Sequence, residues 1–226
     1  MLQPDSRNVR SVQYDVGNIS GDTPLCTIVC GAPCNSFPKE LIQGYVIAAD
    51  RGLDYCLAAG ITPDLAVGDF DSAHRSVPEG VEQIRVSPIK DDTDAALAAD
   101  IAVERGCREI RFFCALGGRL DHTLGNIQLL YSLKKKGIRG RLISEDTEVF
   151  FLMNESAKIP KNDGYMSVFS YEGSVEISIS GVKYPLDKAV LTNDVTLGVS
   201  NEIIEEYAGI TIHEGAALIV LTQFDR

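Results

Sequence analysis

The chain has 226 residues, of which 45% are hydrophobic and 23% are charged, and its formal net charge is −11. This composition is typical of a globular protein with room for one standard domain and a smaller second one. The acidic balance argues against sequence-independent nucleic-acid binding, which depends on Lys and Arg neutralising phosphates. No apolar run approaches the roughly 20 residues of a membrane span, and the N-terminus lacks the apolar core of a signal peptide. We therefore expect a cytoplasmic protein without nucleic-acid or membrane partners.

The first two thirds of the chain have the pattern of a parallel sheet with crossover helices. The polar segment 1–22 shows little periodicity, and we interpret it as a loose arm or an added edge strand. Strands are expected at 26–30, 45–49, 65–67, 82–86, 110–115 and 141–144. Helices are expected at 39–43, 53–59, 93–105 and 121–136. Gly106 and Gly137 mark the ends of the last two helices.

After about Phe151 the helical periodicity stops. Alternating runs such as 174–180 and 216–222, separated by Gly, Asn and Asp turns, predict an all-β region. The expected fold is an α/β N-terminal domain with a mainly parallel sheet, followed by a smaller all-β sandwich domain. The expected division is an arm at 1–22, an α/β domain at 23–150 and a β-sandwich domain at 151–226, with a substantial interface between the two domains.

The six cysteines are scattered singly through apolar runs, unlike the spacing of a disulfide framework. Cys26, Cys30 and Cys34 lie four residues apart, which raises the question of a metal site. The short Cys-x-x-Cys knuckle of zinc sites is missing, however, and no histidine is near. We expect buried free thiols.

Two aspartates follow the expected strand at 65–67. In extended chain the period of two places Asp69 and Asp71 on the same side, just past the end of that strand. Two such carboxylates can hold Mg²⁺ together with water and phosphate oxygens. The alternative is a solvated acidic turn, but adjacent like charges repel each other. The pair therefore predicts a metal site.

A lysine precedes the acidic start of the helix at 93–105. Asp91, Asp92 and Thr93 suit the capping positions, and Asp94 lies in the first turn. Capping does not explain Lys90, because a cation there opposes the helix dipole unless an anion lies between them. A phosphate bound at this helix start would resolve the conflict.

A glycine pair, 117–118, opens the next helix. Glycines at a helix start let backbone N–H groups approach phosphate oxygens, and Arg119 adds a bidentate donor. A glycine pair alone is weak evidence, since tight turns use it often. Asp121, His122 and Asn126 strengthen it, the last two sharing one helix face. Together with the acidic segments, this turn predicts metal-assisted phosphate transfer.

These segments, with Gly198-Val-Ser-Asn-Glu202 and the stretch 181–186, resemble in order and spacing those of thiamine pyrophosphokinases. The similarity spans about residues 27–220. Enzymes of this family transfer pyrophosphate from ATP to the hydroxyl of thiamine and release AMP. The resemblance implies an α/β nucleotide domain followed by a β-sandwich that binds thiamine. It also implies Mg²⁺ as the metal and a homodimer with thiamine bound between the subunits.

The resemblance also implies roles for individual residues. Mg²⁺ and the triphosphate would be held by Asp69, Asp71 and Asp94. The nucleotide would be surrounded by Asp50, Lys90, Thr93, Arg119, His122 and Asn126. Asp121 would face the reacting hydroxyl and is a candidate general base. Thiamine would contact Tyr184, Ser200 and Asn201.

Three departures from the family pattern stand out. Tyr184 lies where some relatives have a tryptophan, and this chain has no Trp. A tyrosine can stack on the cationic thiazolium, but with less π-surface. Residues 31–34 are a loose version of the family's first glycine turn, and Val182 stands where leucine is usual.

Other functions remain open from the sequence. A pyrophosphokinase acting on another hydroxymethyl heterocycle, such as a pterin, would use the same ATP half-site, although Tyr184, Ser200 and Asn201 favour thiamine. A nucleotide-sensing module would bind ATP without forming AMP. An α/β domain with acidic helix caps would show no Mg²⁺-dependent nucleotide binding.

Overall fold

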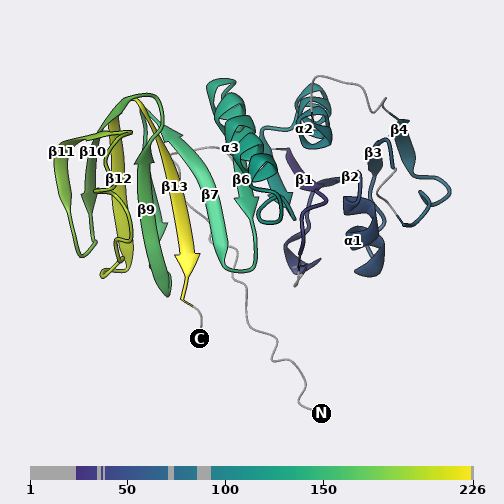
Figure 1. Cartoon of the computed structure of the whole chain (residues 1–226), viewed down its shortest axis with the longest axis horizontal. Helices are drawn as coiled ribbons and strands as arrows, with labels where there is room; N and C mark the ends of the chain where they lie inside the picture. The colour runs from purple at the N-terminus through teal and green to yellow at the C-terminus, as the bar shows by residue number, and fades with distance from the viewer. Residues whose placement is uncertain (1–23, 35–36, 38, 71–73, 86–92, 225–226) are drawn as a thin grey trace, which may run out of the picture.

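The computed structural model describes residues 24–34, 37, 39–70, 74–85 and 93–224. The expected arm at 1–22 lies outside the described residues, as do Asp71 and Lys90. The remaining chain forms two β-sheets, with helices on the first of them (Figure 1).

Six parallel strands form the first part of the large sheet. They are β1 (Leu25–Val29), β2 (Tyr45–Ala49), β3 (Leu65–Gly68), β4 (Glu82–Arg85), β5 (Glu109–Phe113) and β6 (Arg139–Ile143), in the order β4-β3-β2-β1-β5-β6. The apolar runs of β1, β2 and β3 are almost fully buried, as expected for parallel strands covered on both faces.

The strand order reverses between β1 and β5. From β1 the chain moves outward through β2, β3 and β4, and it then returns to place β5 on the other side of β1. In open α/β sheets, ligands bind outside the carboxyl ends of the strands at such a switch point. The loops that follow β1 and β5 therefore lie where a binding site is expected.

Helices cover both faces of the parallel strands. The 3₁₀ helix η1 (Lys39–Leu41) and α1 (Gly52–Ala58) pack on one face, and α2 (Asp94–Glu104) and α3 (Leu120–Lys135) pack on the other. Gly106 and Gly137 follow α2 and α3 with φ of 89° and 74°. These left-handed conformations confirm the predicted helix ends, because glycine adopts them without steric cost.

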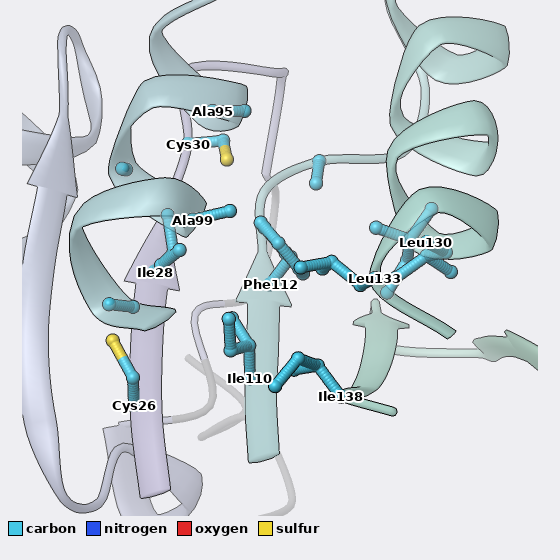
Figure 2. Close-up of a cluster of buried hydrophobic side chains, with 14 of the residues drawn as sticks. Cys26, Ile28, Cys30, Ala95, Ala99, Ile110, Phe112, Leu130, Leu133 and Ile138 are labelled. Atoms are coloured by element: carbon cyan, nitrogen blue, oxygen red, sulfur yellow. The ribbon is translucent and has the colours of Figure 1, made fainter. Parts of the chain in front are cut away.

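The core between the sheet and α2 and α3 is closely packed (Figure 2). Ile28 of β1 and Phe112 of β5 belong to this core and are fully buried. The α2 side chains that face them are small, and Ala95 and Ala99 let that helix lie close to the strands. Truncating a buried phenylalanine such as Phe112 costs about 3–5 kcal/mol through the cavity it leaves.

Three antiparallel strands continue the large sheet beyond β6. They are β7 (Thr147–Met153), β13 (Ala216–Gln223) and β9 (Gly164–Ser170), which bring it to nine strands. A second sheet contains β8 (Ser156–Pro160), β10 (Ser174–Ser180), β11 (Leu186–Thr192) and β12 (Tyr207–Glu214), in the order β11-β10-β12-β8. An α/β region followed by an all-β region is thus confirmed.

Alternating side chains of β7 join the two regions. Phe151 packs with the core on the α3 side, whereas Phe150 and Leu152 pack against the second sheet. One continuous sheet therefore runs through both regions of the chain.

None of the six cysteines forms a disulfide, and five are buried. Cys34, in the loop after β1, is half-buried, so the expectation of a buried thiol is wrong for this residue. Within the described ranges, no helix combines the length and the apolar composition needed to cross a membrane.

Candidate active site

Two acidic segments lie side by side at the carboxyl edge of the sheet. Asp50 follows β2 with φ of 49°, and its N–H donates to the carbonyl of Val67 at 2.8 Å. Gly68 ends β3 with φ of 149°, and a Cβ placed on it would lie 3.1 Å from the Asp50 Cα. Asp69 is half-buried and comes next in the chain. The structure therefore brings the predicted residues Asp50 and Asp69 to neighbouring strand ends.

Helix α2 begins beside the end of β1. The Thr93 Oγ1 accepts the Ala96 N–H at 3.2 Å, which confirms the predicted N-cap. Burial raises the pKa of the Cys30 thiol to about 12, and the negative charge of Asp94 adds to the effect. Figure 2 shows Cys30 under the start of α2, beside Ala95. Asp94 therefore lies at the switch-point end of the sheet.

The carboxylate donors suit a hard divalent cation. Asp69 and Asp94 offer the oxygen ligands that Mg²⁺ prefers. Within the described ranges, no group of three His, Cys, Asp or Glu side chains is gathered closely enough to hold a metal. Asp71, the third predicted ligand, is outside those ranges, so the ligand set remains a prediction.

The loops after β1 and β5 pack against each other. The Ala32 N–H donates to the Cys114 carbonyl at 2.9 Å. Gly117 and Gly118 have φ of 84° and 67°, and a Cβ on Gly118 would lie 2.7 Å from the Pro33 Cδ. The loose glycine turn at 31–34 and the glycine pair thus form one structure at the switch point. A glycine turn before a helix can direct its N–H groups toward an anion.

Arg119 and Asp121 form an exposed ion pair at the start of α3. The Arg119 Nε lies 3.1 Å from Oδ1 of Asp121, and Nη2 lies 2.5 Å from Oδ2. The guanidinium holds the pKa of Asp121 below its usual value, and the His122 main-chain N–H, which donates to Oδ1 at 3.0 Å, acts in the same direction. Asp121 is therefore ionised at neutral pH. The His122 side chain is exposed beside it.

Asn126 anchors α3 to the end of β5. Its side chain is buried, and Nδ2 donates to the Ala115 carbonyl at 2.8 Å. Ala115 lies two residues before the glycine pair. The amide therefore fixes the distance between the helix and the glycine turn.

The three predicted thiamine residues lie together in the β region. Tyr184 is 60% exposed in the loop between β10 and β11. Ser200 is exposed and has φ of 60°, a strained conformation for a residue with a side chain. Asn201 is buried, and its side chain bonds to the Tyr184 main chain.

The predicted site residues form two groups that are far apart within one chain. The aspartates and the glycine pair lie at the carboxyl ends of the parallel strands. Figure 1 shows β10 and β11 at one end of the long axis and β2 and β3 toward the other. A single chain therefore does not bring Tyr184 close to Asp50 and Asp69.

Sequence reasoning missed two positions that shape the acidic edge. Asp54 in α1 accepts the main-chain N–H groups of His74 and Arg75 at 2.9 and 3.0 Å, which holds these two residues against α1. A Cβ on Gly52 would lie 1.9 Å from the Val29 carbonyl oxygen, so only glycine fits there. Neither contact had a sequence signal, because an acidic residue or a glycine at a helix start also fits ordinary capping.

Comparison with known proteins gives consistent matches over most of the chain. A family model described as "Thiamin pyrophosphokinase, catalytic domain" matches residues 41–142, and one described as "Thiamin pyrophosphokinase, vitamin B1 binding domain" matches residues 156–219. The thiamine pyrophosphokinase of Bacillus subtilis is 34% identical over 207 residues, which cover 85% of this chain and 96% of that protein.

Solved structures agree with these matches. The crystal structure of the Bacillus subtilis thiamine pyrophosphokinase aligns with a TM-score of 0.82 at 32% identity, covering 89% of this chain and all of that one. A thiamin pyrophosphokinase from Geobacillus thermodenitrificans aligns with a TM-score of 0.79 at 28% identity, covering 89% of this chain and 98% of that one. The region matched by the catalytic-domain model, 41–142, contains Asp50, Asp69 and Asp94 at the carboxyl edge of the sheet. The region matched by the vitamin B1 binding model, 156–219, contains the loop between β10 and β11 that carries Tyr184.

Proposed function

This chain belongs to the thiamine pyrophosphokinase family, and on that premise we propose how its residues carry out the transfer. The enzyme transfers pyrophosphate from ATP to the hydroxyl of thiamine. The thiamine oxygen forms a bond to the β-phosphorus, the bond from that phosphorus to the oxygen of AMP breaks, and thiamine diphosphate and AMP are released. The hydroxyl proton is lost to a base or to solvent.

The structural observation that carries this assignment is the packing of the loop 31–34 against the glycine pair at the β1/β5 switch point. Backbone N–H groups there, together with the start of α2, form a cradle for phosphate oxygens. Thr93, Asp50, Lys90 and His122 complete the proposed nucleotide site. Arg119 is the proposed bidentate phosphate donor, through guanidinium N–H groups that its bond to Asp121 does not use.

Mg²⁺ is the proposed metal, held by Asp69, Asp71 and Asp94. Support comes from the carboxylate oxygens of Asp69 and Asp94 at the edge that carries the phosphate cradle. A bound Mg²⁺ ion supplies charge neutralisation on the triphosphate and helps align the reacting groups. Without the metal, the acidic edge and the net charge of −11 repel ATP.

Asp121 is proposed to face the thiamine hydroxyl and to accept its hydrogen bond. Arg119 lowers the pKa of this carboxylate, so it is present as the anion throughout the neutral range. The same effect makes it a weak base. Its main proposed contribution is therefore to orient the thiamine hydroxyl. Removal of the hydroxyl proton is a smaller part of its proposed role.

A homodimer is the proposed assembly, with thiamine bound by the Tyr184 loop of one subunit and the acidic edge of the other. The separation of these two groups along the chain's long axis supports it. Ile204, whose main-chain N–H donates to the Gly181 carbonyl at 3.0 Å, is 55% exposed, and Tyr184 itself is 60% exposed. These exposed apolar side chains would be covered by a partner subunit.

We also propose a domain division and a cellular location for this chain. The catalytic and thiamine-binding regions are divided near residue 150, and the ends of the matched family regions at 142 and 156 support this division. The proposed location is cytoplasmic, and six cysteines that form no disulfide support a reducing compartment.

The direct test is incubation of the purified protein with ATP, Mg²⁺ and thiamine, followed by chromatography of the products. Equal amounts of thiamine diphosphate and AMP are expected, and EDTA should abolish both. AMP formation with a hydroxymethyl pterin, but not with thiamine, would support the other acceptor class. ATP binding without AMP from either acceptor would support a sensor.

The shared site has its own test. Asp69→Asn and Tyr184→Ala subunits, each inactive or weakly active alone, are unfolded together and refolded as a mixture. If sites are shared, each mixed dimer contains one site with both defects and one intact site, so about a quarter of the wild-type activity should return. Mixed dimers that form without recovering activity would exclude the shared site, and sedimentation as a monomer at micromolar concentration would exclude the dimer.

A further inference from the structure

The Asn201 side chain makes three hydrogen bonds to main-chain groups. Its Nδ2 donates to the Tyr184 carbonyl at 2.8 Å, and its Oδ1 accepts the Tyr184 N–H at 3.0 Å. The same Oδ1 also accepts the Glu202 N–H at 2.9 Å. These two N–H groups satisfy both lone pairs of the amide oxygen. Asn201 is 8% exposed, so little of it is accessible to a ligand.

The main chain of Asn201 is fixed to the large sheet. Its N–H and carbonyl pair with Met166 of β9 at 3.0 and 2.8 Å. The neighbouring Ser200 N–H donates to the Ser167 Oγ at 3.0 Å, and the Gly198 carbonyl accepts the Val168 N–H at 2.8 Å. The segment 198–201 therefore follows β9 as a short irregular strand. Asn201 is thus a rigid point from which its amide reaches the Tyr184 loop.

Tyr184 depends on this contact for its position. Both of its main-chain hydrogen-bonding groups pair with the Asn201 amide, while the residue as a whole is 60% exposed. The adjacent Lys183 pairs with Glu202 through the main chain at 2.9 Å and through the side chains at 2.7 Å. The Lys183–Glu202 side-chain pair is exposed and contributes little, and the main-chain bond of Lys183 holds the preceding residue, so the amide of Asn201 is the side-chain restraint that acts on Tyr184 itself.

We propose that Asn201 is a positioning residue, which holds the Tyr184 backbone so that the exposed ring is presented to the thiazolium. It acts through Tyr184 and does not itself bind the pyrimidine, in contrast to the role that the family resemblance implies. This proposal rests on the proposed thiamine site. Its structural part, the restraint of Tyr184 by Asn201, can be measured without any substrate.

The absence of tryptophan from the chain makes this measurement possible. Tyr184→Trp introduces a single indole, whose time-resolved fluorescence anisotropy reports the local motion of residue 184. We compare this variant with Tyr184→Trp/Asn201→Ala and Tyr184→Trp/Asn201→Asp. The aspartate variant retains the acceptor for two N–H groups, but it replaces the donor to the Tyr184 carbonyl by a carboxylate oxygen that repels this carbonyl. It therefore remains informative if the alanine variant fails to fold, which circular dichroism would reveal.

Asn154→Ala on the Tyr184→Trp background is the matched control. Asn154 also uses its side-chain oxygen to bond a main-chain N–H, that of Gly215 at 3.0 Å, but at a different turn of the β region. A general loss of order in this region would change the anisotropy of the control as well. A specific role of Asn201 would leave the control unchanged.

Relative to Tyr184→Trp alone, the fast component of the anisotropy decay is expected to increase in both Asn201 variants. It is expected to stay the same in the Asn154→Ala control. The KM for thiamine should rise about tenfold in Asn201→Ala, on the scale of one lost buried hydrogen bond, with kcat and the KM for ATP within about twofold. An unchanged anisotropy would overturn the proposal, and with a raised KM it would indicate direct binding by Asn201. Increased motion with an unchanged KM would also overturn it, because the position of the ring would then not matter.

Failure of the proposed function would be recognised separately. In that case Tyr184→Trp alone would show no thiamine-dependent change in emission and no thiamine diphosphate formation. The anisotropy would still report whether Asn201 restrains residue 184.

Discussion

Gly68 passes so close to Asp50 that a Cβ on the glycine would lie 3.1 Å from the Cα and 3.2 Å from the N of Asp50. This approach places the acidic segment after β3 directly beside the segment after β2. It also explains why glycine is favoured here, because a Cβ would press on the backbone of Asp50 and φ is 149°.

Gly68→Ala should therefore lose both stability and Mg²⁺-dependent ATP binding. The clash and the unfavourable backbone conformation together cost about 1–3 kcal/mol of unfolding free energy. Gly60→Ala is the control, since Gly60 also has a positive φ, 76°, but open space around it. Urea unfolding and equilibrium dialysis with ATP would measure the two effects. Equal ATP binding by the two variants would show that the contact does not shape the site.

The anchor between α3 and β5 gives a second prediction. Asn126→Ala removes the bond to the Ala115 carbonyl and leaves that buried acceptor without this donor. The expected loss is about 1–3 kcal/mol of unfolding free energy, with a raised KM for ATP because the glycine turn shifts. Gln128→Ala, at an exposed position of the same helix, should stay within about 0.5 kcal/mol of the wild type. Thermal unfolding and steady-state kinetics would reveal the difference.

The ion pair of Arg119 and Asp121 predicts a particular pH dependence. A lowered pKa in the folded state contributes stability above the unfolded value of about 3.9 and loses it as the pH falls through the folded value. Because the pair is exposed, this contribution is small. Asp121 therefore does not titrate between about pH 5 and pH 8.

Asp121→Asn should therefore lower kcat about tenfold at every pH between about 5 and 8. This factor is expected for the loss of one charge-assisted hydrogen bond. Profiles of kcat against pH at saturating thiamine and Mg²⁺ would check this. A factor that grows with pH through neutrality would indicate a general base with a raised pKa. Full turnover of the variant would remove Asp121 from the mechanism.

Tyr184 should determine thiamine affinity through its ring. Tyr184→Trp should lower the KM for thiamine, because indole binds cations better than phenol does. Tyr184→Ala should raise the KM about tenfold, in keeping with a cation–π energy of about 1–2 kcal/mol. Tyr184→Phe, which retains a ring, is the matched control and should stay within about twofold of the wild type. Similar KM values for the alanine and phenylalanine variants would exclude a stacking role.

The thiols should differ in their reactivity toward iodoacetamide. Burial raises the pKa of both Cys30 and Cys56 to about 12, so at about pH 8 they are neutral thiols and poor nucleophiles. A hydrogen bond with Cys34, together with burial, raises the pKa of Cys114 as well. Half-buried Cys34 should therefore label first, as mass spectrometry of the native protein would show. Labelling of Cys30 as fast as Cys34 would contradict this, and Cys34→Ser should remove the fast site.

The sequence by itself determined the helices and parallel strands of the α/β region and most of their limits, and it identified the region after residue 151 as all-β. Helical and two-residue periodicities, with glycines at 106 and 137, located α2, α3 and the parallel strands, because local burial and backbone propensity control these features. The acidic and glycine-rich segments also identified the family and the carboxyl edge of the sheet. That identification was possible because these residues follow strands or begin helices in consecutive order.

Only the tertiary structure decided how distant residues use their polar groups. Asn201 and Tyr184 are 17 residues apart, and nothing in their spacing shows that the amide of one is occupied by the backbone of the other. The contacts of Asp54 with His74 and of Gly118 with Pro33 are of the same kind. Which long-range partners meet depends on strand order and loop packing, and these follow from the energy of the whole fold rather than from any local pattern.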